Sequence, residues 1–350
     1  MISIIGGGPA GSMTAIELAR RGIRSQIIEE HKNIGKPVQC TGIVTDSILS
    51  HTKISKKLII NKIKTARIHC NERYIDLSVR DLVLDRTEFD KELFEKAVAH
   101  GSSVIRRRIE SVNDVSNGVV VGADGPNSII RKFLNPKLKV DYLIGKQALI
   151  KGNFDKNIFH VFLGSVAPGF FAWVVPENES YARVGLASRK NTHKYFDKFY
   201  STIMNELTEK SKIVSHQGGL IPIYNPHIKT FRKTTKKKMY IVGDAALQVK
   251  ATTGGGIIPA LRSAKILARS ISEQNNYESS WRKELGKGLY AHLLLRKHLN
   301  KFSDEMYKSL ISDLDNKKIK KLFMETNRDN AIEMLLRLAF TKPSLVKYLI

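Results

Sequence analysis

The first thirty residues constrain the fold of this chain more than any other segment. Residues 2–5 have the apolar pattern of a buried strand, residues from about 10 to 21 that of a helix, and residues 25–29 that of a second strand. This order predicts a parallel βαβ unit, which occurs in sheets that are covered by helices. We therefore expect an α/β protein, and 350 residues are enough for about two domains.

Three glycines occupy the turn between this strand and this helix with the spacing of a dinucleotide-binding motif. Gly6 permits the tight turn, Gly8 lets a pyrophosphate approach, and Gly11 lets the helix pack closely on the strand. The phosphates would lie at the helix N-terminus, where free amides and the helix dipole favour anions. The helix begins there with Pro9 and Ala10.

Three later features could complete such a site. Glu29 ends the second strand, where a carboxylate can accept hydrogen bonds from ribose hydroxyls, although a solvated strand-end carboxylate is the alternative. The segment 122–128 contains Asp124 and Gly125, and the segment 243–246 is followed by a glycine loop and a helix. Two accidental turns are the alternative for these last two segments.

Together these motifs resemble the glutathione-reductase-type flavoproteins of the aromatic-hydroxylase group. Within that group the sequence is similar to the geranylgeranyl reductase family, which includes archaeal digeranylgeranylglycerophospholipid reductases. The resemblance is carried by Gly35-Lys36-Pro37-Val38-Gln39-Cys40-Thr41-Gly42, by Leu84-Asp85-Arg86, by Gly243-Asp244-Ala245-Ala246 and by Lys250-Ala251-Thr252-Thr253-Gly254-Gly255-Gly256-Ile257. It implies an FAD cofactor and the saturation of C=C bonds in geranylgeranyl chains, by hydride transfer from N5 of the reduced flavin.

The resemblance also implies which residues contact the cofactor. These residues are Gly6, Gly8, Pro9, Ala10, Gly11, Glu29, Cys40, Gly42, Arg86, Asp124, Gly125, Gly243, Asp244, Gly254, Gly255, Gly256 and Ile257. Asp244 would hold a ribitol hydroxyl, and Arg86 would pair with phosphates or ribose, with an ordinary surface arginine as the alternative. Cys40 is the candidate catalytic residue, although a lone cysteine is more often a small buried apolar side chain.

An aromatic run could form an apolar wall for a polyprenyl chain. The candidate substrate-binding residues are Phe171, Trp173 and Pro176, and a plain sheet core is the alternative. The run departs from the family pattern, because Phe171 stands where tyrosine is usual and Val175 where phenylalanine is usual. Leu247 likewise stands where the family commonly has a glycine.

The resemblance and the order of elements predict a discontinuous arrangement of domains. The Rossmann-like FAD-binding domain would comprise residues 1–50, 80–135 and 232–275. A mostly antiparallel β-sheet substrate domain, residues 51–79 and 136–231, would be inserted in it. Residues 276–350 would form a C-terminal helical region.

Charge and composition limit which partners the protein can have. The net charge of +25 would draw the protein to an anionic surface such as lipid headgroups, although a lysine-rich chain with solvated faces is the alternative. No nucleic-acid motif and no metal-ligand spacing is found, and two cysteines make no disulfide framework. The absence of a signal peptide and of an apolar run long enough to span a bilayer predicts a cytoplasmic protein, and the basic charge predicts that it is peripheral at the membrane.

Two questions stay open from the sequence. No second nucleotide-binding motif indicates the electron donor, so ferredoxin, NAD(P)H or another reduced carrier could serve. The alternative function is that of a flavin-dependent monooxygenase or halogenase of the same fold, which shares the glycine motifs but activates oxygen.

Overall fold

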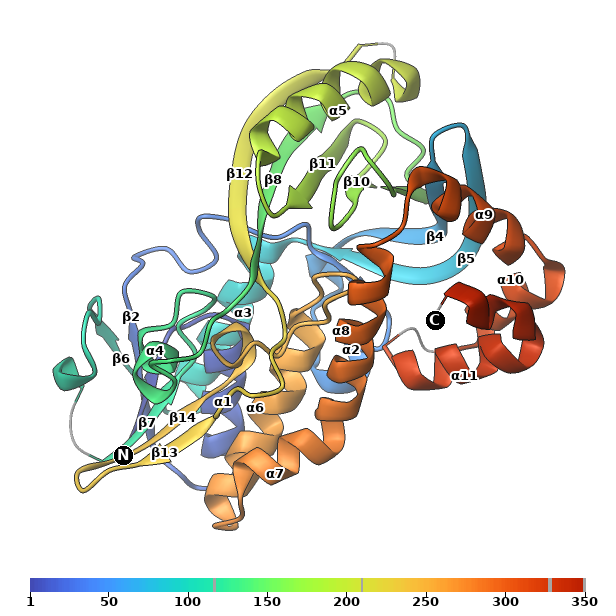
Figure 1. Cartoon of the computed structure of the whole chain (residues 1–350). Helices are drawn as coiled ribbons and strands as arrows, with labels where there is room; N and C mark the ends of the chain where they lie inside the picture. The colour runs from blue at the N-terminus through green and yellow to red at the C-terminus, as the bar shows by residue number, and fades with distance from the viewer. Residues whose placement is uncertain (116–117, 209, 327–328, 349–350) are drawn as a thin grey trace.

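The computed structural model describes residues 1–115, 118–208, 210–326 and 329–348. These residues form two β-sheets and a set of helices, and the C-terminal helices lie beside the second sheet (Figure 1). The predicted fold class, a Rossmann-like FAD-binding unit with an inserted sheet and C-terminal helices, is confirmed.

The first sheet has six strands in the order β13-β14-β7-β1-β2-β6. Its strands are β1 (Ile2–Ile5), β2 (Ser25–Glu29), β6 (Ser103–Arg106), β7 (Gly118–Gly122), β13 (Phe231–Lys233) and β14 (Lys237–Ile241). Neighbouring strands are parallel except for the β13–β14 pair. The predicted βαβ unit is therefore confirmed, although its helix α1 (Pro9–Ala19) ends slightly earlier than expected.

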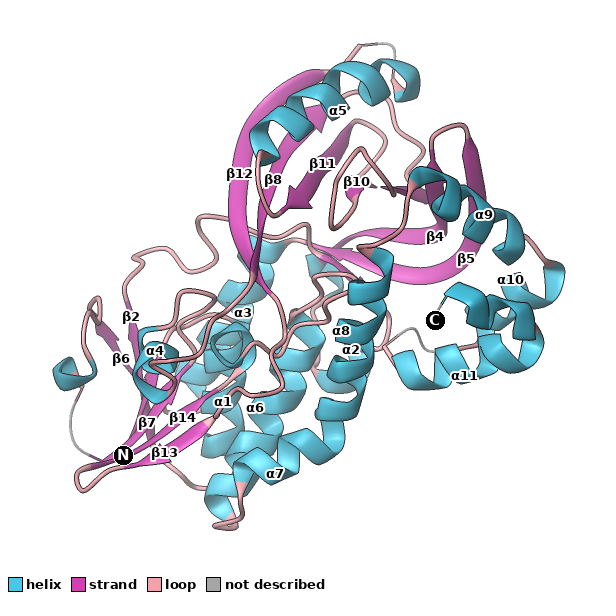
Figure 2. Ribbon diagram, viewed as in Figure 1, coloured by secondary structure: helices cyan, strands magenta, loops and turns pink. Residues whose placement is uncertain are grey.

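Helices cover this first sheet and fix the ends of its strands. They are α1, α3 (Arg86–Ala99), α4 (Ile129–Leu134), α6 (Ile257–Ser272) and α7 (Tyr277–Trp281). Helix α1 packs against both α3 and α6, so the starts of these three helices gather at one edge of the sheet (Figure 2). The α3 helix begins where the Asp85 side chain accepts a hydrogen bond from the backbone N–H of Glu88.

The second sheet has eight strands in the order β12-β8-β11-β10-β9-β4-β5-β3. Its strands are β3 (Ile43–Thr45), β4 (Ile59–Cys70), β5 (Arg73–Leu84), β8 (Tyr142–Lys151), β9 (Ile158–Phe162), β10 (Ala172–Pro176), β11 (Tyr181–Ser188) and β12 (Lys212–Pro222). It is antiparallel except for the β4–β9 pair, as predicted. Helix α5 (Thr192–Leu207) buries Phe196 and Phe199 against its outer face.

A long hairpin lies near one end of this sheet. Strands β4 and β5 pair along most of their length. The hairpin turns at Asn71, with φ of 51°, and β5 then runs to Leu84, directly before the Asp85 N-cap of α3. Both β3 and residues 80–84 pair in the eight-stranded sheet, although the predicted FAD-binding ranges include them. The domain boundaries stay a prediction.

The C-terminal region is helical, as expected. It contains α8 (Lys287–Leu299), α9 (Asp304–Leu314), α10 (Lys317–Glu325) and α11 (Ala331–Thr341), and the short α2 (Ile48–His51) lies earlier in the chain. Helices α9 and α10 pack on the β4–β5 hairpin, and α11 packs on α8 and α10. Among the described residues, no helix is long and apolar enough to cross a bilayer.

Candidate functional site

Of the three motif glycines in the turn after β1, one has room for an added Cβ and two do not. A Cβ at Gly6, whose φ is 100°, would overlap the carbonyl oxygen of Ala123, and a Cβ at Gly11 would overlap the carbonyl oxygen of Gly6. At Gly8, by contrast, no described atom lies within 4 Å of an added Cβ. Gly6 and Gly11 are thus required by packing, whereas Gly8 leaves room beside the N-terminus of α1 for an anion.

Glu29 lies against this turn. One carboxylate oxygen accepts a hydrogen bond from the Gly7 N–H at 2.6 Å, and the other accepts one from the His31 backbone N–H at 2.7 Å. The residue is buried, so the solvated alternative is wrong. A carboxylate held at the end of β2 has the placement expected for a ribose contact.

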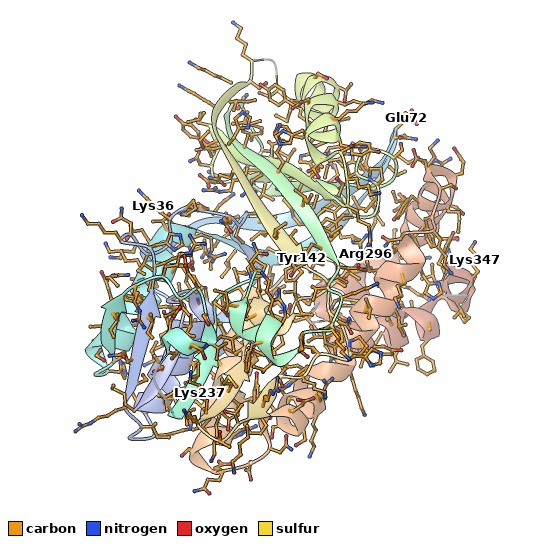
Figure 3. The ribbon with its side chains drawn as sticks, turned by 60° about the vertical axis from the view of Figure 1, so that its left-hand side comes forward. Lys36, Glu72, Tyr142, Lys237, Arg296 and Lys347 are labelled. Carbon is orange, nitrogen blue, oxygen red and sulfur yellow. The ribbon has the colours of Figure 1, made fainter. Side chains whose placement is uncertain are left out.

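A buried arginine, Arg131, connects the segment 122–128 with the segment 243–246. Arg131 donates to the carbonyl oxygens of Pro126 at 2.5 Å and Ala245 at 3.3 Å, and to the Tyr142 hydroxyl at 2.5 Å. Figure 3 shows Tyr142 at the start of β8. Arg131 thus holds two loops together that lie far apart in the sequence.

Asp124 has a structural contact and one free oxygen. Its Oδ2 accepts a hydrogen bond from the Ile129 N–H at 2.7 Å, which stabilises the start of α4. Its Oδ1 is buried without a hydrogen-bond partner in the described part of the chain, and burial raises the pKa of this carboxyl. Gly125 follows with a φ of 71°, a backbone conformation that favours glycine.

The segment 243–246 packs directly on the glycine turn after β1. A Cβ at Gly243 would lie 2.8 Å from the Ala10 Cβ, and a Cβ at Gly256 would lie 2.8 Å from Oδ1 of Asp244. Burial raises the pKa of Asp244 to about 6, although Arg86 and Arg131 oppose this shift. No group among the described residues donates a hydrogen bond to the Asp244 carboxylate, which is therefore available to a hydroxyl-bearing ligand.

The glycine loop after this motif leads into α6. Gly254 has a φ of 68°, and Gly255 accepts a backbone hydrogen bond from the Lys250 N–H at 3.2 Å. Ile257 begins α6, whose first amides point toward this loop. Leu247 has a φ of 56°, which explains why the family commonly has a glycine at its position.

Cys40 lies beside Arg86 at the junction of the two sheets. The side chain of Arg86 is 13% exposed and donates to Asp90 at 2.8 Å, so the surface alternative is wrong. Burial alone would lower the pKa of Arg86, but the neighbouring Asp90 and Cys40 outweigh it and raise the pKa. Gly42 has a φ of 85°, and an added Cβ would lie 2.5 Å from the Leu84 carbonyl oxygen.

The loop that carries Cys40 also contacts the eight-stranded sheet. The Thr41 hydroxyl donates to Gln147 of β8 at 3.1 Å, and Gln147 donates to Gln217 of β12 at 2.8 Å. A Cβ at Gly219 would lie 3.2 Å from the carbonyl oxygen of Gln39. A cavity of about 710 Å³ opens beside this loop, lined by residues 31–33, 36–38 and 215–218 (Figure 3, near Lys36).

Aromatic side chains connect the sheet to the glycine loop. Trp173 meets Phe171 edge to face at 5.9 Å, and Phe171 stacks on Phe170 at 4.1 Å. An added Cβ at Gly254 would lie 3.3 Å from the Phe170 ring. The Trp173 Nε1 is buried and unpaired among the described residues. Pro176 lies farther along β10, where its carbonyl oxygen accepts a hydrogen bond from Asn61, and its role in substrate binding stays a prediction.

The residues present therefore fit a flavin dinucleotide. The open position at Gly8 lies at the start of α1, the carboxylate of Asp244 lies at the start of α6, and the free Oδ1 belongs to Asp124 at the start of α4. Helix N-termini favour phosphates, and carboxylates can accept hydrogen bonds from sugar hydroxyls. Within the described residues, no group of three or more His, Cys, Asp or Glu side chains could hold a metal ion.

Two parts of the chain match models of known protein families. Residues 1–108 match the model of an FAD binding domain, and residues 141–221 match the model of the geranylgeranyl reductase catalytic domain. The second match spans β8 to β12 and includes the contacting rings of Phe170, Phe171 and Trp173. Over residues 141–221 the chain is therefore similar to the geranylgeranyl reductase family. The cofactor of this chain is FAD, and the chain is an FAD-dependent oxidoreductase.

Curated relatives of the family are similar along nearly their whole length. Digeranylgeranylglycerophospholipid reductase 2 of Methanothermobacter thermautotrophicus is 29% identical, and the match covers 90% of this chain and 92% of the relative. Digeranylgeranylglycerophospholipid reductase 2 of Methanopyrus kandleri is 27% identical, with 99% and 98% covered.

Solved structures share the fold. A geranylgeranyl bacteriochlorophyll reductase-like protein from Thermoplasma acidophilum has a TM-score of 0.81 at 24% identity, with 99% of this chain and 98% of that chain covered. A flavin-dependent brominase has a TM-score of 0.71 at 15% identity, with 98% of each chain covered. The fold is therefore common to reductases and halogenases, and it does not by itself distinguish their reactions.

The C-terminal helices contribute charged residues that the sequence motifs did not indicate. Arg296 of α8 is buried and donates to the carbonyl oxygens of Ala251 at 3.1 Å and Thr252 at 2.5 Å, and its guanidinium lies 4.7 Å from the Phe170 ring centre (Figure 3). Burial lowers the pKa of Arg296 to about 10. The Arg296 side chain therefore contacts both the glycine loop and the Phe170 ring.

A second buried group comes from the segment before α11. Asp329 accepts hydrogen bonds from Lys250 at 2.5 Å, from Ser47 at 2.6 Å and from Thr45. Burial would raise the pKa of Asp329, but Lys250 outweighs it and the pKa is lowered. The sequence contains one signal for this pair: Lys250 is the first residue of the glycine-rich segment 250–257, which is part of the family resemblance. Nothing in the sequence pointed to Asp329.

His292 of α8 lies near Lys250 and Asp329. Its Nδ1 lies 2.6 Å from the Thr252 hydroxyl, while its Nε2 is buried and unpaired among the described residues. Burial and the nearby Lys250 lower its pKa to about 3, so the ring is neutral at physiological pH.

Proposed function

We propose that this protein saturates C=C bonds in the geranylgeranyl chains of archaeal-type membrane lipids. One observation carries the proposal: the loop with Cys40 is held between Arg86 of the FAD-binding part and Gln147 of the sheet that matches the catalytic domain of the family. The curated relatives are named for reduction of digeranylgeranylglycerophospholipids. Bound FAD, once reduced, supplies the hydride for such a reaction.

The residues of the chain would bind and orient the reactants. Gly8 and the start of α1 would face the pyrophosphate, Glu29 a ribose and Asp244 the ribitol chain. Phe171 and Trp173 would contact the isoprenoid chain, where each buried methylene contributes about 0.8 kcal/mol. Because a prenyl chain offers almost no polar groups, this apolar contact also excludes water from the site.

An unactivated alkene also needs a proton at the second carbon. Cys40 is our candidate donor, because its thiol lies beside Arg86 on the loop that joins the two sheets. Cys40→Ala should retain FAD, because no flavin-binding backbone group is removed, and should lose most of its turnover. Turnover is followed as the mass gain of the lipid under anaerobic conditions.

Cys70 is the matched control for this experiment. It is the other free cysteine, it is buried, and it lies on β4 with its thiol toward the Asp304 carbonyl oxygen. Cys70→Ala should leave turnover unchanged. If Cys40→Ala turns over lipid at the rate of the unaltered protein, Cys40 has no part in the reaction.

The electron donor and the membrane are the partners that we propose in addition. Ferredoxin, NAD(P)H or another reduced carrier would reduce the flavin, and anaerobic reduction by each carrier separates them. The net charge of +25 would hold the protein at an anionic bilayer, at roughly 1 kcal/mol per well-placed charge. Such binding weakens with salt.

A further inference from the structure

Two neighbouring helices of the C-terminal region expose rows of apolar side chains. On α11, Ile332, Leu336 and Phe340 follow one another at intervals of four residues, and Leu336 is 55% and Phe340 85% exposed. On α8, Tyr290 is 46% and Leu294 41% exposed. Helices α8 and α11 pack against each other (Figure 1), and we call the exposed residues of these two neighbouring helices the α8/α11 surface.

The row on α8 is flanked by basic side chains. Lys287 and Lys297 lie on the same arc of the helix as Tyr290 and Leu294, and Lys283 precedes them one turn earlier. All three lysines are exposed, and none forms an ion pair within the described residues. A row of aromatic and aliphatic side chains bordered by free lysines is typical of helices that lie in a membrane interface.

The acidic group on α11 is neutralised. Glu333 pairs with Arg337 at 2.8 Å, one turn farther along the helix. The exposed apolar row on this helix is therefore accompanied by a paired charge that would not repel an anionic surface.

We propose that the α8/α11 surface is the face with which the protein docks on an anionic lipid bilayer. Helix α11 would lie in the plane of the headgroups, since its 11 residues are far fewer than the roughly 20 needed to cross the hydrocarbon core. Phe340 and Leu336 would enter the interface, and the α8 lysines would contact lipid phosphates. This inference rests on the proposed function, because it assumes a substrate that resides in the bilayer.

Charge favours a bilayer over a second copy of the chain as the occupant. Each copy carries a net charge of +25, so two copies would repel each other at long range, whereas an anionic bilayer is attracted. The free lysines beside the apolar row would face one another in a symmetric dimer, which would further weaken that arrangement.

The proposed docking surface is joined directly to the wall of the flavin site. Helix α11 begins two residues after Asp329, whose carboxylate bonds to Lys250 of the glycine loop and to Ser47 near β3. A bilayer bound to α11 would therefore lie next to the segment that holds this loop in place.

The test is vesicle binding by the full-length holoprotein. Leu336→Glu combined with Phe340→Glu should weaken binding to phosphatidylglycerol vesicles at least about tenfold, because two apolar contacts are replaced by two repelled charges. Lys287→Glu with Lys297→Glu should weaken it by about fivefold for each lysine and should reduce its salt dependence. Phosphatidylcholine vesicles should bind all forms weakly.

Val214 provides the matched control. It is 52% exposed on β12, away from the C-terminal helices, and Val214→Glu should leave vesicle binding unchanged. Every variant should keep the visible flavin spectrum and turn over a detergent-dispersed geranylgeranyl lipid, which shows that the site itself is intact.

The outcomes are distinguishable. Unchanged phosphatidylglycerol binding by the Leu336/Phe340 variant would overturn the proposal. So would a dimeric unaltered protein that this variant converts to a monomer without any loss of vesicle binding, since the surface would then be a contact between copies. Loss of vesicle binding in a protein that never reduces detergent-dispersed lipid would support the docking surface while contradicting the proposed function.

Discussion

The two sides of the flavin site are built in different ways. The side formed by the first sheet consists of backbone: Gly6, Gly11 and Gly243 allow turns and helices to approach until no side chain fits between them. The opposite side, formed with the C-terminal helices, consists of buried charged side chains such as Arg296 and the Lys250–Asp329 pair. Close backbone contact leaves a pattern in the sequence, whereas pairing between distant charged residues does not.

The largest expected effect comes from adding one methyl group to the backbone side. Gly11→Ala should lower the free energy of unfolding by at least about 3 kcal/mol, because the new Cβ overlaps the Gly6 carbonyl oxygen and neither backbone can move freely. Denaturant unfolding of the FAD-free protein measures this.

Two other glycines sharpen that result. Gly288→Ala on α8 should not destabilise the protein, because no described atom lies near its Cβ and alanine favours a helix. Gly8→Ala should also fold normally, yet it should bind FAD about tenfold more weakly, if the open position is where the pyrophosphate lies. A Gly8→Ala protein with normal FAD affinity would mean that the pyrophosphate lies elsewhere.

The next effect tests the charged side. Asp329→Ala should cost about 3 kcal/mol of stability, because it leaves the Lys250 ammonium buried without its partner. It should also weaken FAD binding, since Lys250 belongs to the glycine loop. Thermal unfolding and flavin titration measure the two effects.

Asp315 is the control for this pair. It bonds to Lys320 at 2.6 Å, but both side chains are substantially exposed. Asp315→Ala should therefore cost less than about 1 kcal/mol. Equal losses in the Asp329 and Asp315 variants would contradict the claim that burial makes the Lys250–Asp329 pair important.

A smaller effect is the pH dependence of folding stability, which differs between the two sides of the flavin site. His292 has its pKa lowered to about 3 from an ordinary value of 6.5, so the unfolded chain binds a proton that the folded protein does not, and stability falls as the pH drops below 6.5. Asp244 has its pKa raised to about 6, so its contribution has the opposite sign: stability falls as the pH rises from about 4 toward 6.

Two substitutions separate these contributions in the FAD-free protein. His292→Gln should make stability fall less steeply on acidification, by up to about 1.4 kcal/mol per pH unit between pH 4 and 6. Asp244→Asn should make that fall steeper by a similar amount. Unfolding free energies measured at several pH values check both, and slopes equal to that of the unaltered protein would show that neither group titrates as its burial implies.

The sequence predicted the backbone side of the site well. The glycine spacing, the βαβ order and the later glycine motifs all follow from local pattern, and the structure brings Gly6, Ala10 and Gly243 together at one sheet edge. The assignment of each residue to FAD stays a prediction.

The charged side could not be predicted in the same way. Asp329 and Arg296 lie in helices and loops of ordinary composition, and their roles depend on how the C-terminal region folds back over the glycine loop. The substrate-binding role of Pro176 stays a prediction: it lies three residues after Trp173 on β10, and its carbonyl oxygen accepts a hydrogen bond from Asn61.

The most direct test of the central claim is an anaerobic reaction with lipid. The purified holoprotein is reduced with dithionite, a geranylgeranyl lipid is added, and the flavin absorbance near roughly 450 nm is followed together with the lipid mass. We predict reoxidation of the flavin with a gain of two hydrogens for each saturated bond. A flavin that stays reduced until oxygen is admitted, with the lipid unchanged in mass, would contradict the reductase and indicate an oxygen-dependent enzyme of the same fold.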